Sequence, residues 1–294
     1  MTKISKTNEV LNALFMSHLA RDLVDRLQNS QPPNKQLGQH FLINEGVLDS
    51  IIASAQLQKE DHILEIGPGP GVLTQRLMQS GATISAVEID AVICDHLRKE
   101  FPTLNLTHQD ALMHDWPREI NAIVANIPYQ ISSPLVEKMT QHEHIKRAVI
   151  MVQEEFAHRL NQTTYSDHCS LGMVARLDWK IELAQKVPPH FFSPQPKVQS
   201  RIVLLSRIPR PEHWRLIREL IQHTYAQRRK KIRNTLRKSG GRFLSLGPWK
   251  HEWNSLIQSF ENKWMEARPE ELGFDDWCDF ATKIIQHYHR CIDI

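Results

Sequence analysis

The stretch Ile63-Leu64-Glu65-Ile66-Gly67-Pro68-Gly69-Pro70-Gly71 decides the fold class of this chain. A short apolar run that ends in glycine and proline is typical of a buried strand. The glycines let the backbone turn tightly and approach a ligand closely. A helical pattern over residues 72–79 follows directly. A strand, a glycine-rich turn and a helix in this order predict an α/β unit of a parallel sheet.

The same alternation extends over about 170 residues around this stretch. Seven segments have strand-like patterns: His62–Ile66, Thr83–Ile89, Leu104–His108, Ala122–Ala125, Arg147–Gln153, Lys180–Lys186 and Ser200–Leu205. Helical patterns lie between most of them, so we expect a Rossmann-like, mainly parallel sheet covered on both faces. The last two strands are joined by the proline-rich residues 188–196, which leave no room for a crossover helix. An antiparallel hairpin is therefore expected at one edge of the sheet.

The sequence divides into three parts: residues 1–33, 34–207 and 208–294. Apolar residues of the first part, among them Leu19, Leu23 and Leu27, recur at helical spacing. They predict a helical extension that either packs on the rest of the chain or binds a partner. The second part is the expected α/β catalytic domain. Beyond Pro211 the apolar residues again follow a helical rhythm, which predicts a small all-helical C-terminal domain.

Charge is unevenly distributed along the chain. The formal net charge is +3, but residues 207–243 contain 12 lysines and arginines against 2 acidic residues. Such segregation is typical of a surface that binds a polyanion. A solvated helix face has the same pattern, so a role in nucleic-acid binding needs other support.

Cysteine usage and hydropathy limit the class of protein. The four cysteines, Cys94, Cys169, Cys278 and Cys291, are widely separated and form no Cys-x-x-Cys pair. We therefore expect neither a disulfide framework nor a metal site, and a cytoplasmic location. No run of about 18 apolar residues predicts a membrane span, and the first residues lack the apolar core of a secretion signal. We expect a monomer without membrane contact.

A carboxylate follows the glycine-rich turn at an informative distance. Glu88 ends the second predicted strand, about 20 residues after the turn, where it can accept hydrogen bonds from both hydroxyls of a ribose. The glycines stand at 67, 69 and 71, which departs from the G-x-G-x-x-G dinucleotide pattern. S-adenosylmethionine, which has no pyrophosphate, fits this turn better. Asp110 follows the third strand and either binds the cofactor's adenine or caps a helix.

The tetrad Asn126-Ile127-Pro128-Tyr129 follows the fourth strand at the same edge of the sheet. An exocyclic adenine amine is a poor nucleophile because its lone pair is delocalised into the ring. The Asn126 side-chain oxygen and the Ile127 carbonyl can accept its two hydrogens and direct the lone pair at a methyl group. Pro128 fixes the turn, and Tyr129 offers a ring for base stacking. The alternative is a purely structural Asn-x-Pro turn.

Five ordered motifs resemble those of the family of small-subunit ribosomal RNA adenine dimethyltransferases. They are Gly38-Gln39-His40-Phe41-Leu42, Glu65-Ile66-Gly67-Pro68-Gly69, Asn126 to Pro134, Phe192 to Ser200 and Ala226 to Asn234. The resemblance covers roughly residues 35–290. It implies methylation, with S-adenosylmethionine, of two adjacent adenines in the 3′-terminal hairpin of small-subunit ribosomal RNA. Each adenine would receive two methyl groups and must leave its stack to reach the site.

The resemblance also implies roles for particular residues. S-adenosylmethionine would contact His40, Leu42, Gly67, Gly69, Glu88, Asp110 and Asn126. The target adenine would be held by Asn126, Ile127, Pro128 and Tyr129, with Phe192 on its other face. Phe192 could instead be a core aromatic, and Phe191 competes for its role. Phosphates would be bound by Arg228, Arg229, Lys230, Lys231 and Arg233.

Two other functions share part of this pattern. A methylase of large-subunit ribosomal RNA, of the Erm type, has the same Asn-Ile-Pro-Tyr tetrad, but Pro134 and the helical basic run favour the small-subunit type. A non-catalytic RNA-binding or transcription factor could use the same scaffold, but it would not need an intact tetrad beside Glu88. The chain departs from the family pattern at residues 1–33 and in the segment Tyr165–Leu171, which lacks the usual arginine.

Overall fold

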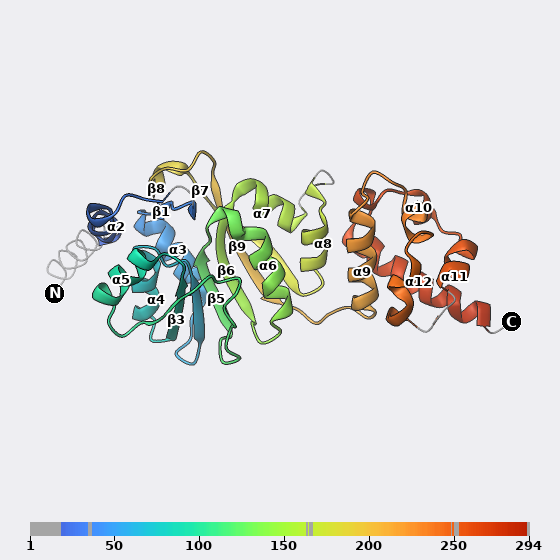
Figure 1. Ribbon diagram of the computed structural model, residues 1–294, viewed down its shortest axis with the longest axis horizontal. Helices are drawn as coiled ribbons and strands as arrows, with labels where there is room; N and C mark the ends of the chain where they lie inside the picture. The colour runs from blue at the N-terminus through green and yellow to red at the C-terminus, as the bar shows by residue number, and fades with distance from the viewer. Residues whose placement is uncertain are drawn as a thin grey trace, which may run out of the picture. The chain divides into compact units, whose positions relative to one another are not determined.

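The computed structural model describes residues 19–34, 37–162, 164, 167–247, 249 and 253–292 (Figure 1). The chain forms two compact units. The first contains the described residues up to Ala157 together with Ile181–Arg207, and the second contains the described residues of His158–Lys180 and of the chain from Ile208 onward. Arg207, the last residue of the predicted α/β domain, is also the last residue of the first unit. Residues 158–180, however, group with the helical unit, although the sequence assigned them to the α/β domain. The part of the N-terminal extension before Leu19 lies outside the described residues.

The first unit is built on a seven-stranded sheet with the strand order β4-β3-β2-β5-β6-β9-β7. Its strands are β2 (His62–Ile66), β3 (Thr83–Glu88), β4 (Asn105–His108), β5 (Ala122–Asn126), β6 (Arg147–Gln153), β7 (Trp179–Val187) and β9 (Ser200–Arg207). The first five pair in parallel, and β9 pairs with β6 in antiparallel fashion. The predicted Rossmann-like fold is confirmed. Every predicted strand is present, with ends that differ by one or two residues at most.

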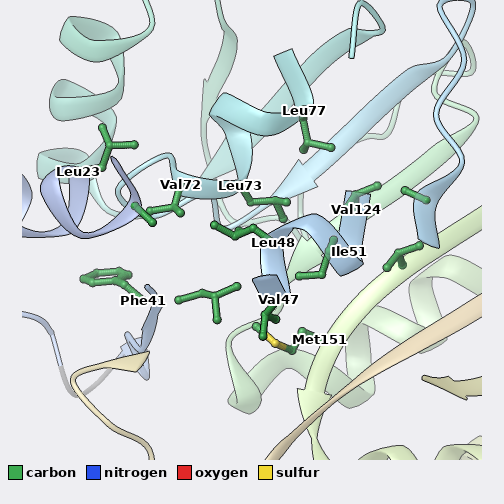
Figure 2. Packing of buried hydrophobic residues seen from close by; sticks show 14 of the residues in the cluster. Leu23, Phe41, Val47, Leu48, Ile51, Val72, Leu73, Leu77, Val124 and Met151 are labelled. Carbon is green, nitrogen blue, oxygen red and sulfur yellow. The ribbon is translucent and has the colours of Figure 1, made fainter. Parts of the chain in front are cut away.

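Helices join the strands of this unit: α3 (Glu45–Ala55), α4 (Val72–Gln79), α5 (Ala91–Glu100), α6 (Ser132–Gln141) and α7 (Glu154–Asn161). They are preceded by α2 (Leu19–Ser30). Apolar side chains of α2, α3 and α4 bury against the sheet in one cluster. In Figure 2, Leu23 of α2 and Val72 of α4 lie in this cluster with Phe41. The described part of the N-terminal extension thus packs on its own chain.

A second, very small sheet was not predicted. It pairs β1 (Phe41–Leu42) with β8 (Phe192–Ser193) in antiparallel fashion, with Leu42 opposite Phe192. Two-residue strands have no periodicity that a sequence pattern could reveal. The pairing nevertheless joins two of the recognised motifs, which are 150 residues apart.

The second unit is helical around an aromatic core. Its α-helices are α8 (Ser170–Ala175), α9 (Trp214–Tyr225), α10 (Ile232–Leu236), α11 (Trp253–Ser259) and α12 (Phe274–Ile292). Trp249, Trp253, Trp277 and Phe280 are fully buried. Met173 and Leu177 join the same cluster, which explains why residues 158–180 fold with this unit. Among the helices that the structure describes, none has the length and apolarity required to cross a membrane.

Candidate active site

A pocket in the first unit lies where β2, β3, β4 and β5 end. Its wall is completed by residues 37–42, which precede the sheet in sequence. All seven residues predicted to bind the cofactor line this pocket: His40, Leu42, Gly67, Gly69, Glu88, Asp110 and Asn126. They come from five separate segments of the chain, and the parallel strands bring most of them together because their carboxyl ends meet at one edge.

The glycine-rich turn between β2 and α4 requires glycine at two positions. Gly69 has a φ of +56°, and a Cβ there would lie 3.1 Å from ring atoms of Phe41. Gly71 has a φ of +88°, and its Cβ would lie 2.2 Å from the ring of Phe101. L-residues with side chains rarely adopt such φ angles. The turn therefore packs tightly against Phe41 and presents bare backbone to the pocket.

Glu88 is a buried carboxylate that backbone donors hold in place. Its Oε1 accepts hydrogen bonds from the amides of Ile89 and Asp90, at 2.8 and 2.9 Å, and its Oε2 accepts one from Gly69 at 3.3 Å. Burial raises the pKa of Glu88, and these hydrogen bonds oppose the rise by favouring the charged form. The side chain thus links the end of β3 to the glycine turn and fits the predicted role as ribose acceptor.

Glu65 also lines the pocket, although no role was predicted for it. Its Oε2 accepts a hydrogen bond of 2.6 Å from the Thr74 hydroxyl. Burial, together with the nearby charge of Glu88, raises the pKa of Glu65 to about 8. Glu65 is therefore largely protonated at neutral pH. It lies within a predicted strand, and its position in the sequence did not distinguish it from the other residues of that strand.

Asp110 has both features that its position suggested. Its Oδ1 accepts a hydrogen bond of 2.8 Å from the Leu112 amide, as a capping side chain does, and the residue also lines the pocket. The turn that follows is held by Lys138 of α6, whose Nζ donates to the carbonyls of Ala111 and Leu112 at 3.2 and 2.9 Å. This contribution of Lys138 was not predicted.

Asn126 ends β5 with its side chain held in one orientation. Its Nδ2 donates to the main-chain carbonyl of His40 at 3.3 Å. Within the described residues, no donor is hydrogen-bonded to its Oδ1. An amide whose NH₂ group is engaged offers its oxygen as an acceptor. The next residue, Ile127, is anchored through its own amide to Met151 at 3.1 Å. Both acceptors assigned to the adenine amine therefore belong to residues fixed by backbone contacts.

Tyr129 is fixed by contacts with two other motifs. Its hydroxyl lies 2.6 Å from the Oγ of Ser200, and its ring stacks near that of His40, with centroids 5.8 Å apart and planes at 27°. The His40 ring also bonds the carbonyl of Pro194, at 2.9 Å. Burial raises the pKa of Tyr129, so it stays neutral. Three of the five recognised motifs thus line this pocket, and a fourth, Phe192 to Ser200, contacts two of its lining residues through Pro194 and Ser200.

Phe192 lies elsewhere. Its side chain is 2% exposed and packs in the core cluster with Phe41 and Leu42. Of the described residues, those that line the pocket do not include it. The structure therefore favours a role for Phe192 as a core aromatic over a role as a ring that stacks on the target base. Phe191 is partly exposed and packs edge-on against His190, with centroids 4.4 Å apart.

The predicted RNA-binding residues lie in the second unit, four of them between α9 and α10 and Arg233 within α10. Arg228, Arg229, Lys230 and Lys231 are exposed. Lys231 and Arg233 both pair with Glu266, at 2.9 and 2.5 Å, which holds the pKa of that carboxyl below its usual value. Two of the five cations thus already have an anionic partner. In the altered segment 165–171, Tyr165 and Ser166 lie outside the described residues.

The residues of the pocket fit S-adenosylmethionine. Of the described residues that line it, none is a lysine or arginine, which suits a ligand without phosphate groups. The acidic residues Glu88 and Asp110 suit its ribose, adenine and positive charge. A Rossmann-like sheet with this turn, this carboxylate and the Asn-Ile-Pro-Tyr loop defines an S-adenosylmethionine-dependent methyltransferase.

Comparison with known proteins specifies the class further. The ribosomal RNA adenine dimethylase family model matches residues 31–251. A probable ribosomal RNA small subunit methyltransferase A from Thermococcus gammatolerans is 33% identical over 243 residues, which cover 82% of this chain and 87% of the relative. A ribosomal RNA small subunit methyltransferase A from Prochlorococcus marinus is 33% identical over 275 residues, which cover 86% and 91%. The chain belongs to the ribosomal RNA adenine dimethylase family.

Solved structures agree with this assignment. A dimethyladenosine transferase from Plasmodium falciparum superimposes with a TM-score of 0.67 at 26% identity, over 85% of this chain and 98% of that one. The 23S ribosomal RNA methyltransferase ErmE superimposes with a TM-score of 0.60 at 23% identity, over 82% and 99%. The second likeness shows a shared fold alone. The predicted enzyme class and cofactor are confirmed, and the residue roles remain predictions.

Proposed function

We propose that this enzyme transfers methyl groups from S-adenosylmethionine to the N6 atoms of two adjacent adenines in the 3′-terminal hairpin of small-subunit ribosomal RNA. Each adenine becomes dimethylated, during assembly of the small subunit. One observation carries the proposal. The Asn126 amide is fixed by the His40 carbonyl with its oxygen available, at the rim of the cofactor pocket. The relatives named small subunit methyltransferase A support the choice of RNA.

The chemistry needs orientation more than acid–base catalysis. When bound, S-adenosylmethionine supplies a methyl group made electrophilic by the sulfonium. The Asn126 oxygen and the Ile127 carbonyl accept the two amine hydrogens, which localises the nitrogen lone pair toward that methyl. Tyr129 supports the base from one face. Holding the reactants in line accounts for most of the acceleration, and no general base is required because the alkylated nitrogen becomes acidic.

The alternatives are not favoured. An Erm-type activity has only a shared fold behind it, since ErmE is 23% identical. A non-catalytic RNA-binding factor would not need Asn126, Glu88 and the glycine turn together around one pocket. We further propose that the enzyme acts as a cytoplasmic monomer on immature small subunits. The four free cysteines fit a reducing compartment.

The direct test is incubation of the protein with radiolabelled S-adenosylmethionine and undermethylated small subunits, followed by mapping of the modified bases. We expect label in two adjacent adenines of the 3′-terminal hairpin, and none in subunits that already carry dimethyladenosine there. Label only in large-subunit RNA would instead identify an Erm-type activity.

Neutralising the exposed cations should weaken RNA binding. We expect a variant with Gln at Arg228, Arg229, Lys230 and Lys231 to bind RNA more weakly and with a flatter salt dependence. Each lost phosphate contact should lower the slope of log K against log salt by roughly 0.7–0.9. The control is Lys59→Gln with Lys99→Gln, which removes exposed charges from the first unit. An unchanged slope in the four-residue variant would move the RNA-binding surface elsewhere.

Removing Glu266 should have the opposite effect. This exposed carboxylate pairs with both Lys231 and Arg233, so it competes with phosphates for them. We expect Glu266→Gln to tighten RNA binding a few-fold and to steepen the salt slope by up to about 1. Glu261→Gln serves as the control, because Glu261 is exposed and forms no ion pair with any other residue that the structure describes. Equal effects of the two substitutions would indicate general electrostatics and no specific competition at Lys231 and Arg233.

A further inference from the structure

Helix α2 is built into the unit that binds the cofactor, although it precedes the region matched by the family model, residues 31–251. Its apolar face is buried, with Leu23 and Val24 at 1% and 0% exposure. These side chains belong to the same cluster as Phe41 and Leu42, which line the pocket. Figure 2 shows Leu23 and Phe41 of this cluster. Burial of this kind stabilises by roughly 1.5–3 kcal/mol per large apolar side chain. Helix α2 is therefore part of the folded catalytic unit.

Polar contacts tie α2 to several elements around the pocket. The Ala20 amide donates to Glu45 of α3 at 2.9 Å, and Arg26 pairs with Glu100 of α5 at 3.3 Å. The Gln28 Nε2 lies 3.4 Å from the carbonyl and the hydroxyl of Ser193 in β8. The helix thus contacts α3, α5 and β8, and β8 pairs with the wall segment at Phe41 and Leu42.

Asp90 connects this helix to the ribose acceptor. Its Oδ2 accepts hydrogen bonds from Gln31, at the end of α2, at 3.4 Å and from Gln39, in the pocket wall, at 3.0 Å. Its Oδ1 caps α5 by accepting from the Val92 amide at 3.0 Å. Its own amide donates to Glu88 at 2.9 Å. One carboxylate, 9% exposed, therefore couples the N-terminal helix, the pocket wall and Glu88.

We propose that α2, acting through Gln31, Gln39 and Asp90, holds the cofactor pocket in its binding-competent form. Gln31 and Gln39 are positioning residues that act through Asp90. They fix the wall segment 37–42 over the pocket and the Glu88 carboxylate below it. A pocket that is ordered before binding loses less conformational entropy when the ligand enters. The proposal rests on the cofactor site and is independent of which RNA the enzyme methylates.

The test compares cofactor affinity in the full-length protein with the variant Gln31→Ala/Gln39→Ala. S-adenosylhomocysteine is the probe, measured by isothermal titration calorimetry. We expect Kd to rise roughly threefold to tenfold, because the lost hydrogen bonds order the pocket without touching the ligand, so only part of their free energy appears in binding. The rate at saturating cofactor and RNA should change by less than about twofold, so the effect falls on KM for the cofactor. The control is Arg21→Ala, which removes an exposed ion pair on the same helix.

Two further measurements separate positioning from general stability. The apo thermal midpoint of the double variant should match that of Arg21→Ala, and a drop in the midpoint that accounts for the loss of affinity would overturn the proposal. In the unmodified protein, S-adenosylhomocysteine should slow amide hydrogen exchange in residues 20–31, which do not line the pocket. The proposal would also be overturned by an unchanged Kd in the double variant, or by hydrogen exchange in α2 that is the same with and without the ligand. If S-adenosylhomocysteine binds normally but small-subunit RNA is not methylated, the result contradicts the proposed RNA target and leaves the proposal about α2 intact.

Discussion

Asn126→Ala is expected to abolish methyl transfer while cofactor and RNA still bind. The substitution removes the side-chain acceptor for the adenine amine and leaves the Ile127 carbonyl alone to orient it. Loss of one well-placed polar group at a reacting centre typically costs ~10²–10³-fold in kcat, and we expect at least that. The measurement is single-turnover methylation with labelled cofactor, together with separate binding assays for S-adenosylhomocysteine and RNA.

The matched control is Asn121→Ala. Asn121 precedes the same strand at its opposite end, and its Oδ1 accepts a hydrogen bond of 3.2 Å from the His62 amide. It is far from the pocket in the register of β5, so we expect a modest loss of stability and a normal rate. Full activity in Asn126→Ala would refute the assigned mechanism.

Glu88→Ala should nearly eliminate cofactor binding. The carboxylate is expected to accept both ribose hydroxyls, and each such charge-assisted hydrogen bond contributes roughly 1.5–3 kcal/mol. Even the lower value for two bonds corresponds to a rise in Kd of roughly 10²-fold. Because Glu88 also accepts from the Gly69, Ile89 and Asp90 amides, alanine additionally loosens the glycine turn. Calorimetry with S-adenosylhomocysteine measures the effect directly.

Glu88→Gln helps to distinguish the two contributions, since it keeps the shape of the side chain and one acceptor. We expect an intermediate Kd and a smaller ligand-induced rise in thermal midpoint than in the unmodified protein. Asp95→Ala controls for the loss of a negative charge, because Asp95 is 68% exposed on α5. If Glu88→Ala binds the probe as tightly as Asp95→Ala does, the ribose is held by another group.

The elements of the sheet were predictable because their signal is local. His62–Ile66 and Arg147–Gln153 are mostly apolar segments between polar or turn-forming neighbours, and both strands occur at the predicted residues. Glu88 and Asn126 could be selected because parallel strands deliver their C-terminal residues to one edge. The spacing of Leu19, Leu23 and Leu27 also predicted the helical extension. That spacing did not show whether the helix packs on its own chain or binds a partner.

Contacts between distant segments had no such signal. The β1–β8 pair is two residues long, and Gln31 and Asp90 are 59 positions apart. Lys231 and Glu266 are separated by 35 positions, so the basic run looked more accessible in sequence than it is in space. Phe192 was assigned to the base through its motif, but its side chain packs in the core. Hydrophobic type alone does not distinguish a stacking ring from a buried one.

The order of the elements, the cofactor turn and the identity of the reactive loop could be predicted from the amino-acid sequence, because each depends on neighbouring residues. How these parts constrain one another became visible in the fold: the His40 carbonyl holds Asn126, Ser200 holds Tyr129, and Gln31, next to α2, contacts Asp90. Such contacts form when packing brings remote backbone and side chains within hydrogen-bonding distance. Periodicity and spacing along the chain carry no record of that proximity.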